Sequence, residues 1–474
     1  MAEIKKIDKL IDARKVMLNL VKDYFHSLNF QSYPAAANKA PKINRIKIEI
    51  PPISPLNWLS HQENSHKLYW SNRDDSFQIS GVGQADIIES ENGNRFGGML
   101  DKIQQNLKEN QNDIKYFGGF HFAFSASKRD KLEGWKPFSD FKMILPLCEL
   151  IFENNKFFFA VNINAKKNSL QVDKILHEID QLIFETSKKQ TELPLLISRH
   201  DTPDRAGWEE AIKKSLDSIR VNGLKKIVLA RQSLLEFEAE IDSLNLISRL
   251  KENAIGSFMF LFQFDSISTF LGATPELLYR REDDRITTEA IAGTRLRGST
   301  EESDFNLENE LLHSDKDVRE QQYVVNSIRA SLNELCVQNN NSTNPGSSKR
   351  SVLKLSQVQH LITKFQGKLK NKITDSSILS SLHPTPAVGG YPRAEALKEI
   401  SSLEQFDRGW YAGPVGWISS NSAEFAVAIR SGLVQKNNLY LYSGAGILDG
   451  SKATDEWNEI ENKISSFISI LNIK

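Results

Sequence analysis

Residues 270–297 read FLGATPELLYRREDDRITTEAIAGTRLR, and the rest of the chain is organised around this stretch. The pattern predicts a strand that runs into a turn at Glu276, a charged hairpin, and a second strand that ends at Gly293 and Thr294. Pro275 has no backbone N–H and Gly293 lets another backbone come close, so the two strand ends can enclose a small molecule. The same residues also fit a plain hairpin with a polar tip.

The composition is that of a globular protein with a small-molecule partner. Among 474 residues, 60 lysines and arginines balance 60 aspartates and glutamates, and 40% of the residues are hydrophobic. A neutral chain provides no electrostatic case for binding nucleic acid. Cys148 and Cys336 are far apart and lack metal-ligand spacing, which argues against a zinc site, a disulfide framework and secretion.

The N-terminus has mixed charge and lacks the pattern of a secretion signal. No stretch approaches 18 apolar residues, the length that a membrane-spanning helix needs. We therefore expect a cytoplasmic protein without a membrane segment.

Strands and helices alternate along the chain, which is typical of a mixed fold. Apolar residues at helical spacing predict helices over residues 1–35, 170–187 and 308–336. A single strand is expected over residues 424–433. A polar, proline-bearing link over residues 188–204 marks the only internal boundary that the composition indicates.

Two predicted helices carry carboxylates on one face. Asp317 and Glu320 stand three residues apart near a helix start, and Glu456, Glu459 and Lys463 share a face of the last helix. One carboxylate from each helix would suit a hydrated Mg²⁺, which takes one or two carboxylates, waters and anionic substrate oxygens. The alternatives are a solvated helix start, where acids are favoured, and an exposed salt-bridged face.

Groups suited to binding an anion follow two predicted strands near the C-terminus. Arg430 ends the apolar run FAVAI, where a guanidinium can clamp a carboxylate with two hydrogen bonds. Gly444, Ala445 and Gly446 follow the next strand, and the glycines leave backbone N–H groups accessible. This short motif is weak alone and gains weight because Arg430 and Lys463 flank it.

Lys226 is a candidate base. It follows Lys225 at the entry to a buried strand, so one lysine should face solvent and the other inward, where an amine near other cations loses its proton more easily. The alternative is a pair of edge lysines that discourages strand pairing. His360 and His383 have no metal-ligand spacing and no nucleophile motif nearby, which favours hydrogen-bonded structural roles.

Seven motifs, in order, resemble those of the chorismate-utilising enzymes: KIVLAR at 226–231, GATPELL at 272–278, IAGTRLRG at 291–298, SDKDVRE at 314–320, AIRSG at 428–432, SGAGI at 443–447 and EWNEIENK at 456–463. The looser N-terminal pattern of the family is also similar: Trp58-Leu59, Tyr69-Trp70, Arg73 and FGGFHF at 117–122. The resemblance thus covers the chain from about residue 55.

This resemblance implies a single large α+β domain of two related halves, in which stacked antiparallel β-sheets are covered by helices. The halves would span residues 51–190 and 200–474. An N-terminal helical segment and a first strand would occupy residues 1–50.

The resemblance also assigns roles to residues. It implies that Lys226 is the base that activates water and that Glu276 is the acid that protonates the departing C4 hydroxyl of chorismate. It implies Mg²⁺ as cofactor, with Glu320 and Glu459 as ligands and Glu456 as a helper. The residues that match substrate-binding positions of the family are Gly293, Thr294, His360, Tyr411, Arg430, Gly444, Ala445, Gly446 and Lys463.

Within the family, the turn LHPTPAVGGYP at 382–392 looks like that of the isochorismate synthases rather than the FPxGTxSGxPK of the ammonia-using synthases. The resemblance therefore implies an isochorismate synthase, an isomerase serving menaquinone or catecholate siderophore biosynthesis. Two alternatives stay open: a salicylate synthase, which goes on to eliminate pyruvate, and a catalytically silent binding paralogue. Neither a glutaminase subunit nor an oligomer is expected, so the chain should be monomeric.

Overall fold

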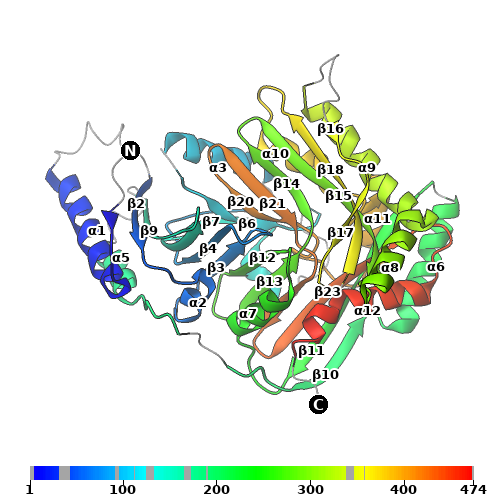
Figure 1. Cartoon of the computed structure of the whole chain (residues 1–474), viewed down its shortest axis with the longest axis horizontal. Helices are drawn as coiled ribbons and strands as arrows, with labels where there is room; N and C mark the ends of the chain where they lie inside the picture. Colours follow the sequence, from blue (N-terminus) through cyan, green and yellow to red (C-terminus); the bar gives the residue numbers. More distant parts are fainter. Residues whose placement is uncertain are drawn as a thin grey trace.

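Figure 1 shows a computed structural model of the chain, in which two β-sheets lie among peripheral helices. The structure describes residues 5–30, 43–90, 96–110, 113–123, 133–164, 172–187, 191–221, 223–337, 346–356 and 358–471.

The larger sheet, sheet A, has thirteen strands within these described ranges and is antiparallel except where β1 runs parallel to β2. Its strands in spatial order are β1 (Lys5–Lys6), β2 (Ile43–Ile50), β9 (Lys156–Asn164), β8 (Cys148–Glu153), β4 (Phe77–Val82), β3 (Lys67–Ser71), β12 (Phe258–Gln263), β13 (Ser268–Thr274), β22 (Ser431–Gln435), β23 (Asn438–Ile447), β11 (Lys226–Phe237) and β10 (Leu196–Thr202), with β19 (Gly390–Tyr391) also beside β11. Its central strands, such as β12, are nearly continuous apolar runs because both faces are buried.

The smaller sheet, sheet B, has ten antiparallel strands, counted over the same described residues. In spatial order they are β16 (Gly346–Ser347), β18 (Val358–Lys368), β15 (Arg285–Leu296), β14 (Leu277–Glu282), β21 (Ser422–Val427), β20 (Pro414–Ile418), β6 (Tyr116–Phe120), β7 (Phe141–Leu145) and β5 (Asp86–Glu89), with β17 (Ser351–Lys354) also beside β18. The predicted charged hairpin is confirmed as β14 and β15, whose turn contains Asp283 at a positive φ of 50°.

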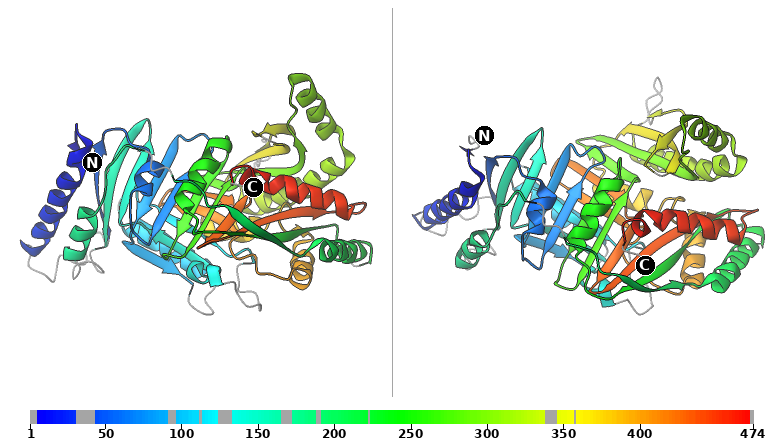
Figure 2. Two further views of the ribbon diagram at one scale, coloured as in Figure 1. Left: turned by 90° about the horizontal axis from the view of Figure 1, so that it is seen from below. Right: turned by 60° about the horizontal axis from the view of Figure 1, so that its bottom comes forward.

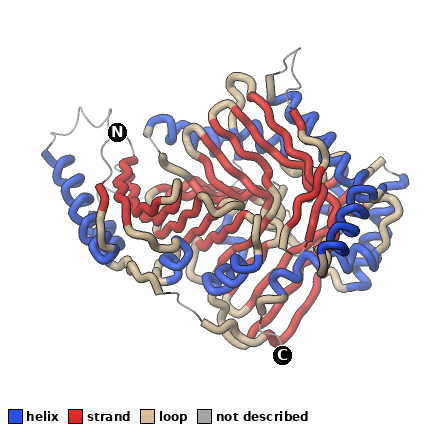
Figure 3. Tube along the Cα trace, in the orientation of Figure 1, coloured by secondary structure: helices blue, strands red, loops and turns tan. Residues whose placement is uncertain are grey.

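Helices cover the outer surfaces of both sheets (Figure 3). They are α1 (Ala13–Phe30), α2 (Pro55–Ser60), α3 (Phe96–Glu109), α5 (Val172–Asp180), α6 (Arg205–Val221), α7 (Ser243–Asn253), α8 (Glu301–His313), α9 (Asp315–Leu335), α10 (Asp375–Leu382), α11 (Arg393–Leu403) and α12 (Ala453–Ile468), with 3-10 turns at Leu10–Asp12 and Glu133–Phe138. For the site, two matter most: α9 packs on β15 and β18, and α12 packs on β23. In the views of Figure 2, α1 and α6 lie at opposite ends of the molecule.

Two of the passages of the chain between the two sheets lie side by side. The chain leaves sheet A after β13 and enters sheet B at β14, and it returns from β21 to β22. Since β13 pairs with β22 and β14 pairs with β21, the two passages run antiparallel to each other. We call residues 274–276 and 427–430 the double crossing.

Hydrogen bonds across the double crossing hold its two strands together. The N–H of Val427 donates to the carbonyl of Glu276 at 3.0 Å, and the N–H of Ala273 donates to the carbonyl of Arg430 at 3.1 Å. The Thr274 hydroxyl donates to the carbonyl of Val427 at 2.6 Å. These hydrogen bonds provide partners for backbone groups that lie between the two sheets.

One hydrophobic cluster includes side chains from both sheets, and polar contacts link the sheets as well. The indole N–H of Trp70 on β3 donates to Glu424 on β21 at 3.4 Å. The α+β fold with two antiparallel sheets and covering helices is therefore confirmed. The division into two related halves remains a prediction.

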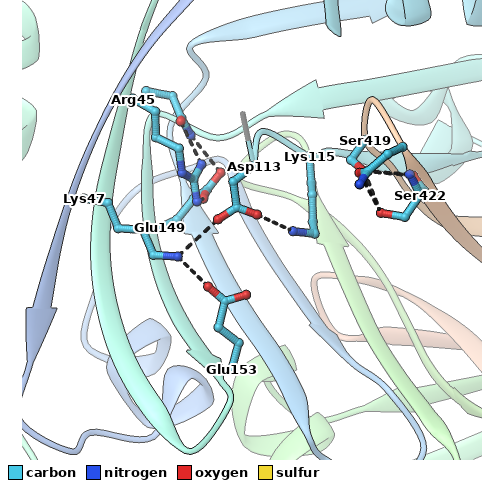
Figure 4. Close-up of polar contacts among 10 residues, drawn as sticks. Arg45, Lys47, Asp113, Lys115, Glu149, Glu153, Ser419 and Ser422 are labelled. Carbon is cyan, nitrogen blue, oxygen red and sulfur yellow. Dashed lines mark hydrogen bonds and ion pairs between the residues drawn. The ribbon is translucent and has the colours of Figure 1, made fainter. Parts of the chain in front are cut away.

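An ionic network, buried at Glu149 and exposed at Asp113, joins the N-terminal edge of sheet A to the segment just before β6 in sheet B (Figure 4). Arg45 on β2 pairs with Glu149 on β8 at 2.7 Å, and Lys47 on β2 bridges Asp113 at 3.1 Å and Glu153. Although burial opposes it, the charges of Lys115, Arg45 and Lys47 lower the pKa of Asp113 to about 2. These pairs link strands of sheet A to the segment that enters β6, and we interpret them as structural.

Four element predictions were wrong in their bounds. The helix predicted over residues 1–35 begins only at Ala13, because Lys5–Lys6 form a short strand beside β2; its predicted end lies outside the described residues. The helix predicted over 170–187 ends at Asp180, and residues 170 and 171 also lie outside the described ranges.

The two other errors lie next to the site. The helix predicted over 308–336 is divided at Ser314, whose hydroxyl accepts a hydrogen bond from the N–H of Asp317 and so starts a new helix there. The strand predicted over 424–433 is two strands in different sheets, because Arg430 adopts a positive φ of 51° at the crossing. Among the described residues, no helix is long and apolar enough to span a membrane.

Gly272, at the end of β13, has no room for a side chain. A Cβ there would lie 2.7 Å from the Phe260 ring and 2.9 Å from the carbonyl oxygen of Arg430. We therefore expect Gly272→Ala to lower the free energy of unfolding by about 1–3 kcal/mol. Gly98→Ala on α3 is the control, since nothing lies within 4 Å of its Cβ and helix propensity favours alanine. Urea unfolding measures both, and an equal effect of the two substitutions would contradict the argument.

Candidate active site

A pocket lies against the double crossing, with an empty volume of about 720 Å³ that includes the space open to solvent at its mouth. Side chains from both sheets and from α9 and α12 line it: Val228, Pro275, Glu276, Ile291, Ala292, Gly293, Thr294, Glu320, His360, Ala387, Val388, Tyr411, Ala412, Ile429, Arg430, Tyr442, Ser443, Gly444, Glu459 and Lys463.

Glu276 is the buried acid of this pocket, with a relative exposure of 4%. Its backbone N–H lies 3.3 Å from the Thr274 hydroxyl, within the double crossing. Burial raises the pKa of Glu276 to about 7, although the charges of Lys226 and Arg73 act in the opposite direction. A carboxyl with this pKa is partly protonated near neutral pH and can donate a proton.

Lys226 begins β11 and is fully buried, whereas Lys225 is exposed, as the sequence predicted for one of the two lysines. The Nζ of Lys226 donates to the Oε1 of Glu320 on α9 at 2.9 Å. Gly446 permits this approach, because a Cβ there would lie 2.6 Å from Glu320 Oε1 and 2.9 Å from Lys226 Cε. Lys226 itself does not line the pocket; it reaches the lining through Glu320.

Three lysine–glutamate pairs gather where α9 meets α12. Besides Lys226 with Glu320, Lys463 pairs with Glu459 at 2.6 Å and Lys316 pairs with Glu456 at 2.7 Å. Burial, and then the charge of Glu459, raises the pKa of Glu456. Although burial opposes it, Lys463 lowers the pKa of Glu459, so this carboxylate remains ionised.

The carboxylates of Glu320 and Glu459 line the pocket and are the hard oxygen donors that Mg²⁺ prefers. Among the described residues, no three or more histidine, cysteine, aspartate or glutamate side chains form a ready-made metal site. Mg²⁺ commonly uses only one or two protein carboxylates together with waters and substrate oxygens. The donors present therefore fit this ion.

Arg430 is the cation best placed to bind an anion. Burial lowers its pKa to about 10, so the guanidinium still carries its charge at neutral pH. Within the described part of the chain, no hydrogen bond or salt bridge to this guanidinium is found, unlike the three paired lysines. An anionic ligand would supply the missing partner.

His360 and Thr294 form a polar wall of the pocket. His360 Nδ1 lies 3.2 Å from the carbonyl of Gly293 and 3.1 Å from the Thr294 hydroxyl. Because a carbonyl only accepts, Nδ1 carries the proton in this contact and Nε2 is an acceptor. Burial lowers the pKa of His360 to about 3, so the ring is neutral.

The glycine-rich end of β23 brings backbone and side chains close together. Lys463 donates to the carbonyl of Gly444 at 2.8 Å, and a Cβ at Gly444 would lie 3.3 Å from the Tyr411 hydroxyl. Tyr411 stacks on Tyr442, with ring centroids 5.3 Å apart. Ala445 is fully buried between these positions and does not line the pocket.

The structure thus places most of the predicted site residues around one pocket. Lys226, Glu456, Ala445 and Gly446 stand just behind its lining. His383, expected to be structural, is buried and contacts the carbonyl of Phe122 through Nε2 at 2.8 Å.

Sequence reasoning missed mainly apolar lining residues: Val228, Ile291, Ala292, Ala387, Val388 and Ile429. Two signals were available. Val228 is two residues from Lys226 on the same strand face, and Ala387 and Val388 belong to the proline-rich turn at 382–392.

Comparisons with known proteins agree with this arrangement. The family described as chorismate binding enzyme matches residues 29–472. The chloroplastic isochorismate synthase of Catharanthus roseus is 32% identical over 84% of this chain and 68% of its own length. The isochorismate synthase MenF of Escherichia coli is 30% identical over 92% of this chain and 95% of its own length. The solved structure of the menaquinone-specific MenF of Escherichia coli superposes with a TM-score of 0.82, at 28% identity, over 98% of this chain and all of that chain.

The raised pKa of Glu276 makes stability depend on pH. In the folded chain the Glu276 carboxyl keeps its proton up to about pH 7, whereas in the unfolded chain it loses the proton near pH 4.5. The protonated carboxyl therefore contributes stability that is fully present below pH 4.5 and is lost as the pH rises through 7. We expect Glu276→Gln to stabilise the protein at pH 8 relative to pH 5 by roughly 3 kcal/mol at most. Urea unfolding at the two pH values measures this difference. Glu63→Gln, at an exposed glutamate, is the control and should change little; no pH trend for Glu276→Gln would show that its burial has been misjudged.

Proposed function

The chain belongs to the chorismate-binding enzyme family, and from this premise we propose that it is an isochorismate synthase. It would convert chorismate reversibly to isochorismate by adding water at C2 and losing the C4 hydroxyl. One arrangement carries the proposal: Glu276, whose pKa is raised by burial, shares a pocket with Arg430, which has no partner among the described residues, and the buried Lys226 stands beside them. These are an acid, an anion clamp and a candidate base.

The proposed chemistry needs one proton donor and one acceptor. Lys226 takes a proton from the incoming water as its oxygen bonds to C2, and Glu276 gives a proton to the C4 hydroxyl, which leaves as water. The ring double bonds shift between these two carbons. Both groups then exchange protons with solvent, and the reverse reaction uses the same residues in exchanged roles.

Charged groups would orient the substrate. The Arg430 guanidinium and the Lys463 amine are the cations of the lining and suit the two carboxylates of chorismate. Thr294 and neutral His360 offer a hydroxyl and a ring nitrogen to a substrate hydroxyl. The apolar residues Val228, Ile291 and Val388 exclude water from the ring.

We propose that Glu320 and Glu459 hold Mg²⁺, with Glu456 beside them. When bound, the ion supplies positive charge to a substrate carboxylate. Burial, and then the charge of Glu459, raises the pKa of Glu456, so a bound cation would be favourable beside these carboxylates.

One of the solved structural relatives, the MenF of Escherichia coli, is described as menaquinone-specific. On this ground we propose that isochorismate made by this chain enters menaquinone biosynthesis rather than a catecholate siderophore route. The reaction itself is tested by incubating the pure protein with chorismate and Mg²⁺ and separating the products. Isochorismate alone supports the proposal, salicylate with pyruvate indicates a salicylate synthase, and no turnover indicates a silent paralogue.

Removing either proton-transfer group should abolish most of the activity. We expect Lys226→Ala and Glu276→Gln each to lower kcat by roughly 10²- to 10⁴-fold, the range of general acid–base catalysis. Lys225→Ala, at the exposed neighbour, should keep normal turnover. Isochorismate formation measured by chromatography distinguishes the three variants, and near-normal turnover of Lys226→Ala or Glu276→Gln would disprove the roles.

Magnesium binding should depend on the α12 carboxylate. We expect a chelator to stop turnover, added Mg²⁺ to restore it, and Glu459→Gln to weaken Mg²⁺ binding by at least roughly tenfold. Calorimetry of Mg²⁺ binding gives a readout besides activity. Asp455→Asn, at an exposed acid on the same helix, should bind Mg²⁺ as the unchanged protein does, and equal effects of the two substitutions would argue for a general loss of charge.

A further inference from the structure

Arg73, in the turn between β3 and β4, makes a close set of contacts beside the catalytic pocket. Its Nη1 and Nη2 donate to the two carboxylate oxygens of Glu289 on β15 at 3.0 and 2.6 Å. Nη2 also donates to the carbonyl of Pro275. The guanidinium lies 4.9 Å from the ring centroid of Phe258, and the exposed fractions of Arg73 and Glu289 are only 20% and 5%.

The carbonyl of Pro275 belongs to the peptide bond that leads directly into Glu276. Pro275 lies in the short link between β13 and β14, and the Arg73 side chain supports its carbonyl there. Neighbouring backbone contacts fix the other side: Val427 donates to the carbonyl of Glu276 at 3.0 Å. Arg73 therefore completes the set of contacts that orient the peptide of the acid.

We infer that the Arg73–Glu289 pair positions and tunes the catalytic acid: Arg73 holds the Pro275–Glu276 peptide in place, and the opposite charges of the pair balance each other at Glu276. This inference rests on the proposed function for the role of Glu276 as an acid. Arg73 and Glu289 line no part of the pocket, so they act through Glu276 and are positioning residues.

The charges that face Glu276 come from several elements. Three positive charges favour its ionised form: Lys226 on β11, Arg73 in the turn between β3 and β4, and Lys463 on α12. The negative charge of Glu289 on β15 favours its protonated form. The pocket lining has six other charged or titratable groups: Tyr411, Arg430, Tyr442 on β23, Glu320 on α9, His360 on β18, and Glu459 on α12. Within this set, Arg73 and Glu289 form the pair that is bound to the backbone before Glu276.

Opposite charges predict opposite effects on the pH profile. Activity requires protonated Glu276, so kcat/KM falls as pH rises through its pKa. Arg73→Gln removes a positive charge and should move this basic limb to higher pH by roughly one unit. Glu289→Gln removes a negative charge and should move the limb to lower pH by a similar amount, and the double variant should return it close to the original position.

A conservative variant separates positioning from charge. Arg73→Lys keeps the positive charge but loses the planar fork that reaches Glu289 and Pro275 together. We expect the basic limb to stay in place while kcat falls by roughly tenfold to a hundredfold, because the acid is less well oriented. Arg280→Gln is the matched control, since Arg280 pairs with Glu424 at 2.6 Å on β14 and β21 away from the pocket lining; its profile should be unchanged.

Infrared titration of the carboxyl band that Glu276→Gln removes measures the same shifts without turnover. Opposite shifts in Arg73→Gln and Glu289→Gln support the inference even if the protein does not isomerise chorismate, in which case only the proposed function fails. Shifts in the same direction, or none in folded variants, overturn it. If Arg73→Gln does not fold, the other two variants still test the inference. It is overturned if the titration of the Glu276 carboxyl is unchanged in Glu289→Gln and Arg73→Lys keeps its full kcat.

Discussion

The double crossing is the constraint on which the site depends. Two antiparallel strands leave one sheet and enter the other side by side, and each must satisfy its backbone groups during the passage. The carbonyls of Glu276, Val427 and Arg430 do so by accepting hydrogen bonds from the opposite strand or its side chains. As a result, the acid and the anion clamp are attached to the same rigid joint. Their separation cannot change unless both sheets move.

Local strain and close approach accompany this joint. Arg430 adopts a left-handed backbone conformation, which is unfavourable for a residue with a side chain and persists only where surrounding contacts impose it. Gly272 leaves no space for a Cβ beside the carbonyl of Arg430. The burial that raises the pKa of Glu276 also destabilises its ionised form, so the property that would suit it to the proposed proton transfer lowers stability at high pH. Three arginine–carboxylate pairs lie around β14: Arg73 with Glu289, Arg280 with Glu424 and Arg281 with Asp375.

Charge in the pocket is arranged unevenly, and this asymmetry is informative. Glu320, Glu456 and Glu459 each have a lysine partner, whereas Arg430 has no partner among the described residues. An anionic substrate bound at Arg430, together with a metal cation bound at Glu320 and Glu459, would rearrange these pairs. If their charges cancelled, the net charge of the pocket would stay the same. Charges also balance at Glu276, because Arg73 lowers its pKa and Glu289 raises it.

The sequence by itself predicted the β14–β15 hairpin and the inward direction of one lysine at 225–226, because turn residues and charge are local properties. The α+β fold class with stacked sheets was predicted through the resemblance to a family. The sequence also named residues far apart in the chain, from Lys226 to Lys463, through their resemblance to a family. It could not show that residues 424–433 divide between two sheets, since neither the apolar run FAVAI nor the polar residues after it indicate which sheet each residue joins. Only the tertiary structure brought Arg73 to the peptide before Glu276, because that contact joins positions 202 residues apart and depends on how the sheets pack.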